Sequence, residues 1–144
     1  MDKSLVGKSL LTFVLVGGAL SAFLFDWNAS HVFNPLWQPH ARYHIAVNIF
    51  FFTGVASVAT WLLWRPSREP QVAFAAAALF SLAFWTPFFY VPLFVPTASY
   101  WAGAPGHEPR IAGMMVYPNL VIFMIFILLT AVGWWFGRSA PADR

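Results

Sequence analysis

The chain has 144 residues, of which 60% are hydrophobic and only 9% are charged, with a mean hydropathy of +0.67. Soluble domains carry about 25% charged residues, so this composition excludes an ordinary water-soluble domain and indicates a membrane protein. The net charge of +3 comes from scattered Lys and Arg, which argues against a nucleic-acid partner, and the absence of cysteine excludes disulfides and thiol chemistry.

Four apolar segments are long enough to cross a bilayer, which takes about 20 helical residues. They cover roughly residues 5–25, 39–64, 72–95 and 117–136. The first segment resembles a signal peptide because a lysine, Lys3, precedes its apolar run. This run is longer than the apolar region of a usual signal peptide, so we expect the segment to remain as a helix. We predict an all-α fold: one integral membrane domain, residues 1–144, forming a polytopic antiparallel bundle of four transmembrane helices.

Basic residues predict the orientation of this bundle. One predicted side carries Lys3, Lys8, Arg65, Arg68, Arg138 and Arg144, and the other carries Arg42 and Arg110. Because Lys and Arg in short loops favour the cytoplasmic side, both termini are predicted to be cytoplasmic. The long connections at about residues 26–43 and 96–116 are then extracytoplasmic, and all four histidines lie in or beside them.

The first long connection leads into a polar row on the second segment. Pro39 suits the first turn of a helix, with Gln38 before it as a cap. From that start, His40, His44 and Asn48 fall at i, i+4 and i+8 and form one stripe that descends into the membrane. A polar stripe at that depth is costly unless it faces a cavity or a partner.

The third segment ends in "TPFFYVPLFVP", where three prolines are expected to kink or break the helix: Pro87, Pro92 and Pro96. A kinked aromatic helix opens space inside a bundle. We therefore predict an aromatic-lined cavity that opens outward, with the histidine stripe on one wall.

Three interpretations of the histidines stay open. First, an outward-facing pocket binds or processes a lipid or another lipophilic small molecule, with histidine as acid or base. Second, the protein is a structural or assembly subunit of a membrane complex. Third, His40 and His44 hold a divalent metal ion in a membrane metalloenzyme, although no HExxH pattern accompanies them.

Ionisable groups near the membrane gather on one side, which favours the pocket. We predict His40 and His44 as its catalytic or head-group residues. The predicted ligand-binding residues are Asp26, His31, Arg42, Asn48, His107 and Tyr117. The pattern leaves open whether the pocket binds or turns over its ligand. Small residues spaced four apart, at Gly17/Ser21 and Gly133/Gly137, favour contact with a second copy or a membrane partner.

Residues 27–44 follow the pattern W-N-x-S-H-x-x-N-P-x-W-x-P-H-A-R-x-H. This run resembles the first loop of a family of small, uncharacterised four-helix membrane proteins. The resemblance covers about residues 26–48 and the number of helices. It implies a four-helix membrane fold and brings no established activity.

Overall fold

A computed structural model describes residues 2–95, 99–101 and 106–139 of the chain. Within these residues the helices are α1 (Lys3–Asp26), α2 (Pro39–Trp64), α3 (Pro70–Trp85), α4 (Pro87–Phe94) and α5 (Pro118–Gly137). Strands β1 (Arg110–Ile111) and β2 (Met114–Met115) form a small antiparallel hairpin. Because α3 and α4 form one span, the described chain has 4 helical segments long and apolar enough to cross a membrane, which confirms the predicted all-α bundle.

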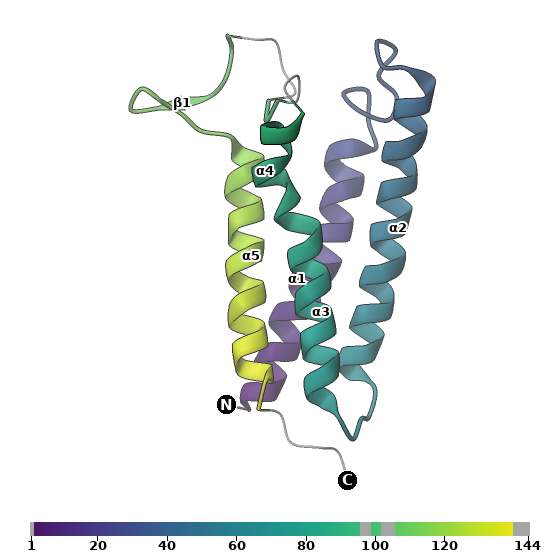
Figure 1. The fold of residues 1–144 in the computed structure, drawn as a ribbon, viewed down its shortest axis with the longest axis vertical. Helices are drawn as coiled ribbons and strands as arrows, with labels where there is room; N and C mark the ends of the chain where they lie inside the picture. The colour runs from purple at the N-terminus through teal and green to yellow at the C-terminus, as the bar shows by residue number, and fades with distance from the viewer. Residues whose placement is uncertain (1, 96–98, 102–105, 140–144) are drawn as a thin grey trace.

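The helices run antiparallel, so that α1 begins and α5 ends at the same end of the bundle (Figure 1). We call this the terminal end. The opposite end, the loop end, carries residues 27–38 and the β1–β2 hairpin (Figure 1). The connection between α2 and α3 lies at the terminal end. Residues 27–38 and the described part of the connection between α4 and α5 therefore lie at the same end of the bundle.

Proline starts four of these helices: Pro39, Pro70, Pro87 and Pro118. The first-turn N–H of a helix has no partner inside the helix, so a proline there loses nothing. The predicted start of α2 at Pro39 is confirmed. Gln38 occupies the cap position, but its side chain makes no capping hydrogen bond.

The predicted break in the third span lies at Pro87. α3 ends at Trp85, and Thr86 donates to Leu82 O from both its N–H (3.0 Å) and its Oγ1 (2.8 Å). Pro87 then begins α4, which contains Pro92. The third predicted proline, Pro96, lies outside the described residues.

Glycines let the helices approach one another closely at the terminal end. A Cβ atom added to Gly7 would lie 2.7 Å from Gly133 O, and one added to Gly137 would overlap the Phe74 ring. Gly133 and Gly137 are buried and contact other helices of the same chain. Contact of this pair with a second chain stays a prediction. Gly17 and Ser21 are half-buried.

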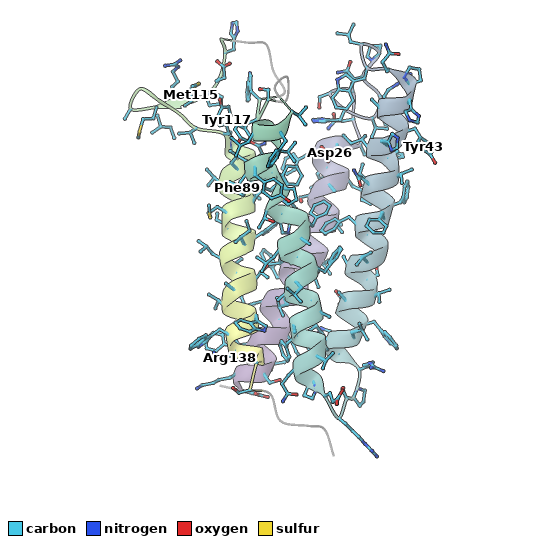
Figure 2. All side chains as sticks on the ribbon, in the orientation of Figure 1. Asp26, Tyr43, Phe89, Met115, Tyr117 and Arg138 are labelled. Carbon is cyan, nitrogen blue, oxygen red and sulfur yellow. The ribbon has the colours of Figure 1, made fainter. Side chains whose placement is uncertain are left out.

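Large apolar side chains cover the outside of the bundle (Figure 2). Leu24, Leu79 and Leu128 are 74%, 67% and 57% exposed, for example. Water-soluble proteins rarely expose such continuous apolar surface. The surface instead matches lipid, in agreement with the four candidate spans.

Candidate functional site

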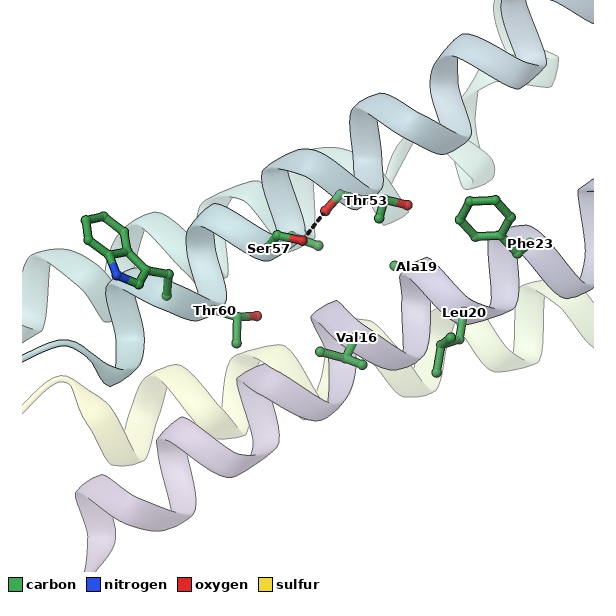
Figure 3. Close-up of a pocket in the computed structure, with 9 residues that line it drawn as sticks. Val16, Ala19, Leu20, Phe23, Thr53, Ser57 and Thr60 are labelled. Atoms are coloured by element: carbon green, nitrogen blue, oxygen red, sulfur yellow. Dashed lines mark hydrogen bonds between the residues drawn. The ribbon is translucent and has the colours of Figure 1, made fainter.

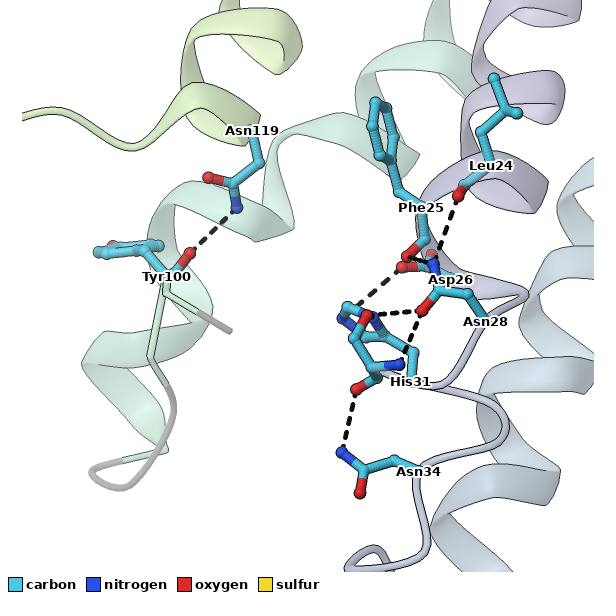
Figure 4. Close-up of polar contacts among 9 residues, drawn as sticks. Leu24, Phe25, Asp26, Asn28, His31, Asn34, Tyr100 and Asn119 are labelled. Carbon is cyan, nitrogen blue, oxygen red and sulfur yellow. Dashed lines mark hydrogen bonds and ion pairs between the residues drawn. The ribbon is translucent and has the colours of Figure 1, made fainter. Parts of the chain in front are cut away.

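Asn28 organises the chain where it leaves α1. Its Nδ2 donates to Phe25 O (2.8 Å) and to Leu24 O (3.3 Å), so two carbonyls at the helix end gain partners. Its Oδ1 accepts from both Ser30 N (2.8 Å) and Ser30 Oγ (2.6 Å). All four contacts agree with one orientation of the amide, and they hold Ser30 and the following residue in place (Figure 4).

His31 is oriented by this arrangement. Its Nδ1 lies 2.7 Å from Ser30 Oγ. Because Ser30 gives its one hydroxyl hydrogen to Asn28 Oδ1, His31 must carry a hydrogen on Nδ1 and donate it to Ser30 Oγ. The opposite ring atom, Nε2, then lies 3.7 Å from Asp26 Oδ1 (Figure 4). The Nε2 side of the ring is therefore turned toward the Asp26 carboxylate.

A second polar wall stands across from this loop (Figure 4). Tyr100 donates through its hydroxyl to Phe89 O (3.0 Å), and Asn119 Nδ2 donates to Tyr100 O (3.2 Å). These bonds tie the segment around Tyr100 to α4 and to the first turn of α5. On the loop side, Asn34 Nδ2 donates to Ser30 O (3.1 Å) and its Oδ1 accepts from Leu36 N (2.9 Å).

Between the two walls lies a pocket of about 860 Å³, which we call the loop-end pocket. Its rim is polar and its floor is apolar and aromatic. The rim includes Asp26, Asn28, Ser30, His31, Asn34 and Asn119, and the floor includes Ala22, Phe84, Trp85, Phe88, Ile122 and Phe123. The rings of Phe88 and Trp85 pack on Phe123 with centroid distances of 4.3 and 4.9 Å.

Trp85 is a notable part of this floor. Its side chain is 2% exposed, and its buried indole Nε1 has no hydrogen-bond partner in the described part of the chain. Leaving such a donor unpaired costs about 1–3 kcal/mol. The described residues therefore do not complete the polar contacts of this region.

The structure places two of the predicted site residues in the pocket, Asp26 and His31. It places His40, His44 and Asn48 on the exposed surface of α2, outside the lining of the pocket. The expectation that their stripe forms one wall of the cavity is wrong. His40 and His44 instead contact each other, with 3.0 Å between their Nε2 atoms.

Helical geometry explains this difference. The inward face of α2 is set by Ile49, Phe52 and residues further along the same face. Each step of four residues overshoots a full turn by about 40°. The row that leads from Phe52 back through Asn48 and His44 therefore winds away from the bundle. Ile45 is the α2 residue that reaches the pocket.

The remaining predicted residues lie elsewhere at the loop end. Arg42 is half-buried, and its Nε is buried without a partner in the described residues. Tyr117 donates to Met115 Sδ (3.6 Å) and packs on Tyr100 with 5.4 Å between centroids. His107 is exposed beside Glu108. Backbone N–H groups of Glu108 itself and of Gly106 lower the pKa of the Glu108 carboxyl.

No group of three or more His, Asp or Glu side chains in the described ranges is arranged to hold a metal ion. The predicted set also lacked the residues that build the pocket, chiefly Asn28, Ser30 and Trp85. Asparagine just after a helix followed by serine two positions later is a typical local hydrogen-bonding pattern, so Asn28 carried a readable signal. Trp85 had none, because an aromatic residue in an apolar helix is ordinary core.

A second cavity of about 500 Å³ lies between α1 and α2 (Figure 3). Two of its hydroxyls bond the helix that carries them: Thr53 Oγ1 donates to Ile49 O and Ser57 Oγ donates to Thr53 O, both at 2.8 Å. Thr60 Oγ1 is buried and has no partner in the described residues. The rest of its lining is largely apolar, so this groove offers little for recognising a head group.

Comparison with known proteins leaves the activity open. No protein of curated function and no solved structure matches the chain. One family model matches it over residues 10–140, nearly the whole length of the bundle. The chain therefore belongs to the family of unknown function DUF6640.

Proposed function

We propose that this protein is an integral membrane protein whose loop-end pocket binds a lipid or another lipophilic small molecule. The observation that carries the proposal is the pocket itself: about 860 Å³, with an aromatic floor among the helices and a polar rim at their ends. Ligand sites for small molecules typically combine such walls with a few placed polar groups. The motif of residues 27–44 supplies much of this rim.

The unpaired Trp85 N–H supports the same conclusion. Buried donors without partners are rare in folded proteins, and those that exist need an explanation. A ligand that brings an acceptor to the floor of the pocket would supply one. The packing of Trp85 against Phe123 and Phe126 keeps the ring in place with or without such a partner.

The proposal includes an orientation in which the terminal end is cytoplasmic and the pocket opens on the other side. Cations at the terminal end sit on tryptophan rings: Arg138 lies 3.4 Å from the Trp135 centroid, Arg65 lies 5.2 Å from Trp61, and Lys8 lies 5.8 Å from Trp64. Tryptophan and basic side chains mark the membrane–water interface, and the basic excess marks the cytoplasmic face.

The test is native mass spectrometry of the protein purified in mild detergent. Ala22 lines the pocket, so Ala22→Phe would fill part of it, while Ala131→Phe adds the same ring to an exposed position on α5. We expect a co-purifying organic mass in the wild type and in Ala131→Phe that is lost or reduced in Ala22→Phe. Equal retention in both variants would place the molecule elsewhere and contradict the proposal.

The pair of histidines on α2 supports a second, separate candidate. Two Nε2 atoms 3.0 Å apart can both bind one divalent ion, which would need its remaining ligands from water or a partner. Zinc titration of the metal-free protein, compared with His44→Ala, tests it. A site of one ion per chain that disappears in the variant is expected if the pair binds metal, and equal binding in both proteins would refute it.

A further inference from the structure

The charges lining the loop-end pocket are unbalanced. Asp26 contributes a carboxylate, and among the described residues no lysine or arginine lines the walls. The titratable side chains of the lining are Asp26, His31 and Tyr100. With histidine and tyrosine neutral, an entering head group meets one negative charge at the rim of an otherwise aromatic and uncharged cavity.

The orientation of His31 leaves a place for one positive charge beside Asp26. The Nδ1 hydrogen of His31 is donated to Ser30 Oγ, so a neutral His31 has its lone pair on Nε2, 3.7 Å from Asp26 Oδ1. A lone pair facing a carboxylate is unfavourable. A proton on Nε2 removes the repulsion, and so does a cation that lies beside the two groups.

Aromatic rings also line the pocket, and one of them stands beside His31. Trp37, Tyr100 and Trp101 belong to the lining, and the Trp37 ring lies 5.4 Å from the His31 ring between centroids. The face of an aromatic ring attracts an ammonium group within about 6 Å, tryptophan most strongly. A carboxylate with several aromatic rings is a combination that favours a substituted ammonium over an alcohol or a carboxylate.

We propose that the loop-end pocket selects lipophilic molecules with a cationic ammonium head, bound by Asp26 beside His31. This inference rests on the proposed function and adds the chemistry of the head group. Ammonium heads come from two sources, a choline or ethanolamine membrane lipid and a free lipophilic amine. Both present the same group on an apolar body.

The experiment compares three probes with one chain length: dodecyltrimethylammonium, dodecanol and dodecanoate. Binding is measured on the full chain in phosphatidylglycerol nanodiscs, for the wild type, Asp26→Asn and the control Glu108→Gln. Glu108 is an acidic residue two positions before β1 that does not line the pocket. All three proteins are measured in the same bilayer, so the probe partitions into lipid to the same extent in each case. The ratio of the affinities of two proteins is therefore independent of this partition.

For Asp26→Asn we expect dodecyltrimethylammonium to bind at least about fivefold more weakly, a loss reduced from the full Coulomb energy by solvent screening. Dodecanol should be almost unchanged and dodecanoate should bind more tightly. Glu108→Gln should match the wild type for all three probes. Equal weakening of all probes in Asp26→Asn would show a structural role for Asp26 and overturn the inference, and so would no change at all.

Substitution of His31 gives a second readout. His31→Gln removes the imidazole, the group beside Asp26 that can itself carry a positive charge, so dodecyltrimethylammonium should bind at least as tightly as to the wild type. Weaker binding of this probe, with dodecanol unchanged, would mean that the cation needs His31 and would contradict this arrangement.

The same experiment distinguishes a membrane lipid from a free amine as the source of the ammonium head. It also distinguishes failure of the head-group inference from failure of the proposed function. If phosphatidylcholine nanodiscs abolish the difference between wild type and Asp26→Asn, membrane lipid occupies the site. If the difference persists there, the site takes a free amine. If none of the three probes binds in the pocket, with Ala22→Phe binding each as the wild type does, the proposed function itself fails. If all bind without preference, only the head-group inference fails.

Discussion

The hydroxyl oxygens of Ser81 and Thr130 lie 2.7 Å apart in the buried interface between α3 and α5. Thr130 Oγ1 also lies 2.7 Å from Phe126 O, to which it donates its one hydrogen, so Ser81 must be the donor in the pair. The two side chains are 1% and 0% exposed. They form a polar link between α3 and α5 within a core of aromatic and aliphatic residues.

This link predicts an asymmetric double-mutant cycle. Thr130→Val leaves the Ser81 hydroxyl without an acceptor and should lower the free energy of unfolding by about 1–2 kcal/mol. Ser81→Ala should cost less, because Thr130 keeps its bond to Phe126 O. The coupling should be near 0.6 kcal/mol, about the average for such pairs in membranes. Denaturant titration in detergent measures all four proteins, and strict additivity would contradict the bond.

Close helix packing at the terminal end predicts that Gly137→Ala is strongly destabilising. The added methyl would overlap the Phe74 ring, and such overpacking costs about 1–3 kcal/mol. Gly54 on α2 is the matched control, because nothing lies within 4 Å of a Cβ placed there. Gly54→Ala should be neutral or stabilise by up to about 1 kcal/mol. Comparable losses in both variants, measured by thermal unfolding, would argue against this packing.

The loop that orients His31 should depend on Asn28. Asn28→Ala removes the contacts with Leu24 O, Phe25 O and Ser30, and we expect faster hydrogen exchange over residues 28–36 with little change in α5. Ala29→Ser changes the exposed neighbour and should leave exchange at the wild-type rate. If Asn28→Ala exchanges like Ala29→Ser, the side chain of Asn28 does not hold the loop.

The proposed orientation can be tested directly because the chain has no cysteine. Ala29→Cys introduces a thiol at the loop end, and Ser139→Cys introduces one at the terminal end, both at exposed positions. In intact cells, a membrane-impermeant maleimide should label Ala29→Cys, and should label Ser139→Cys only after the membrane is permeabilised. The reverse pattern would invert the proposed topology.

Asn48 offers a test of the hypothesis that the protein is a structural or assembly subunit of a membrane complex. It is exposed on α2 about 12 Å along the helix from His40, within a candidate membrane span. A polar side chain facing lipid favours a hydrogen bond to another helix. If the protein assembles through this face, Asn48→Leu should shift it to a smaller species in cross-linking and size-exclusion experiments, whereas Val47→Leu should not. Identical profiles would exclude Asn48 as the contact.

Sequence patterns predicted the parts of this protein that depend on local chemistry. Apolar runs of helical length predicted the spans, and Pro39 and Pro87 marked a helix start and a helix break where the structure has them. These features follow from properties of a few neighbouring residues: hydrophobicity for the spans, and the missing N–H for the prolines. The position of Asp26 and His31 at the loop end was predicted in the same way, because both residues come shortly after the first apolar run.

The site itself depended on facts that no local pattern contains. His40 and His44 have the right spacing for one helical face, but which face turns inward was decided by the packing of Ile49 and Phe52 against other helices. Trp85 became the floor of a pocket because α3 breaks at Pro87 beside α5. The sequence by itself determined the helices and the end at which polar groups gather. Only the tertiary structure decided which of those groups share a cavity, because helix rotation is set by long-range packing of side chains.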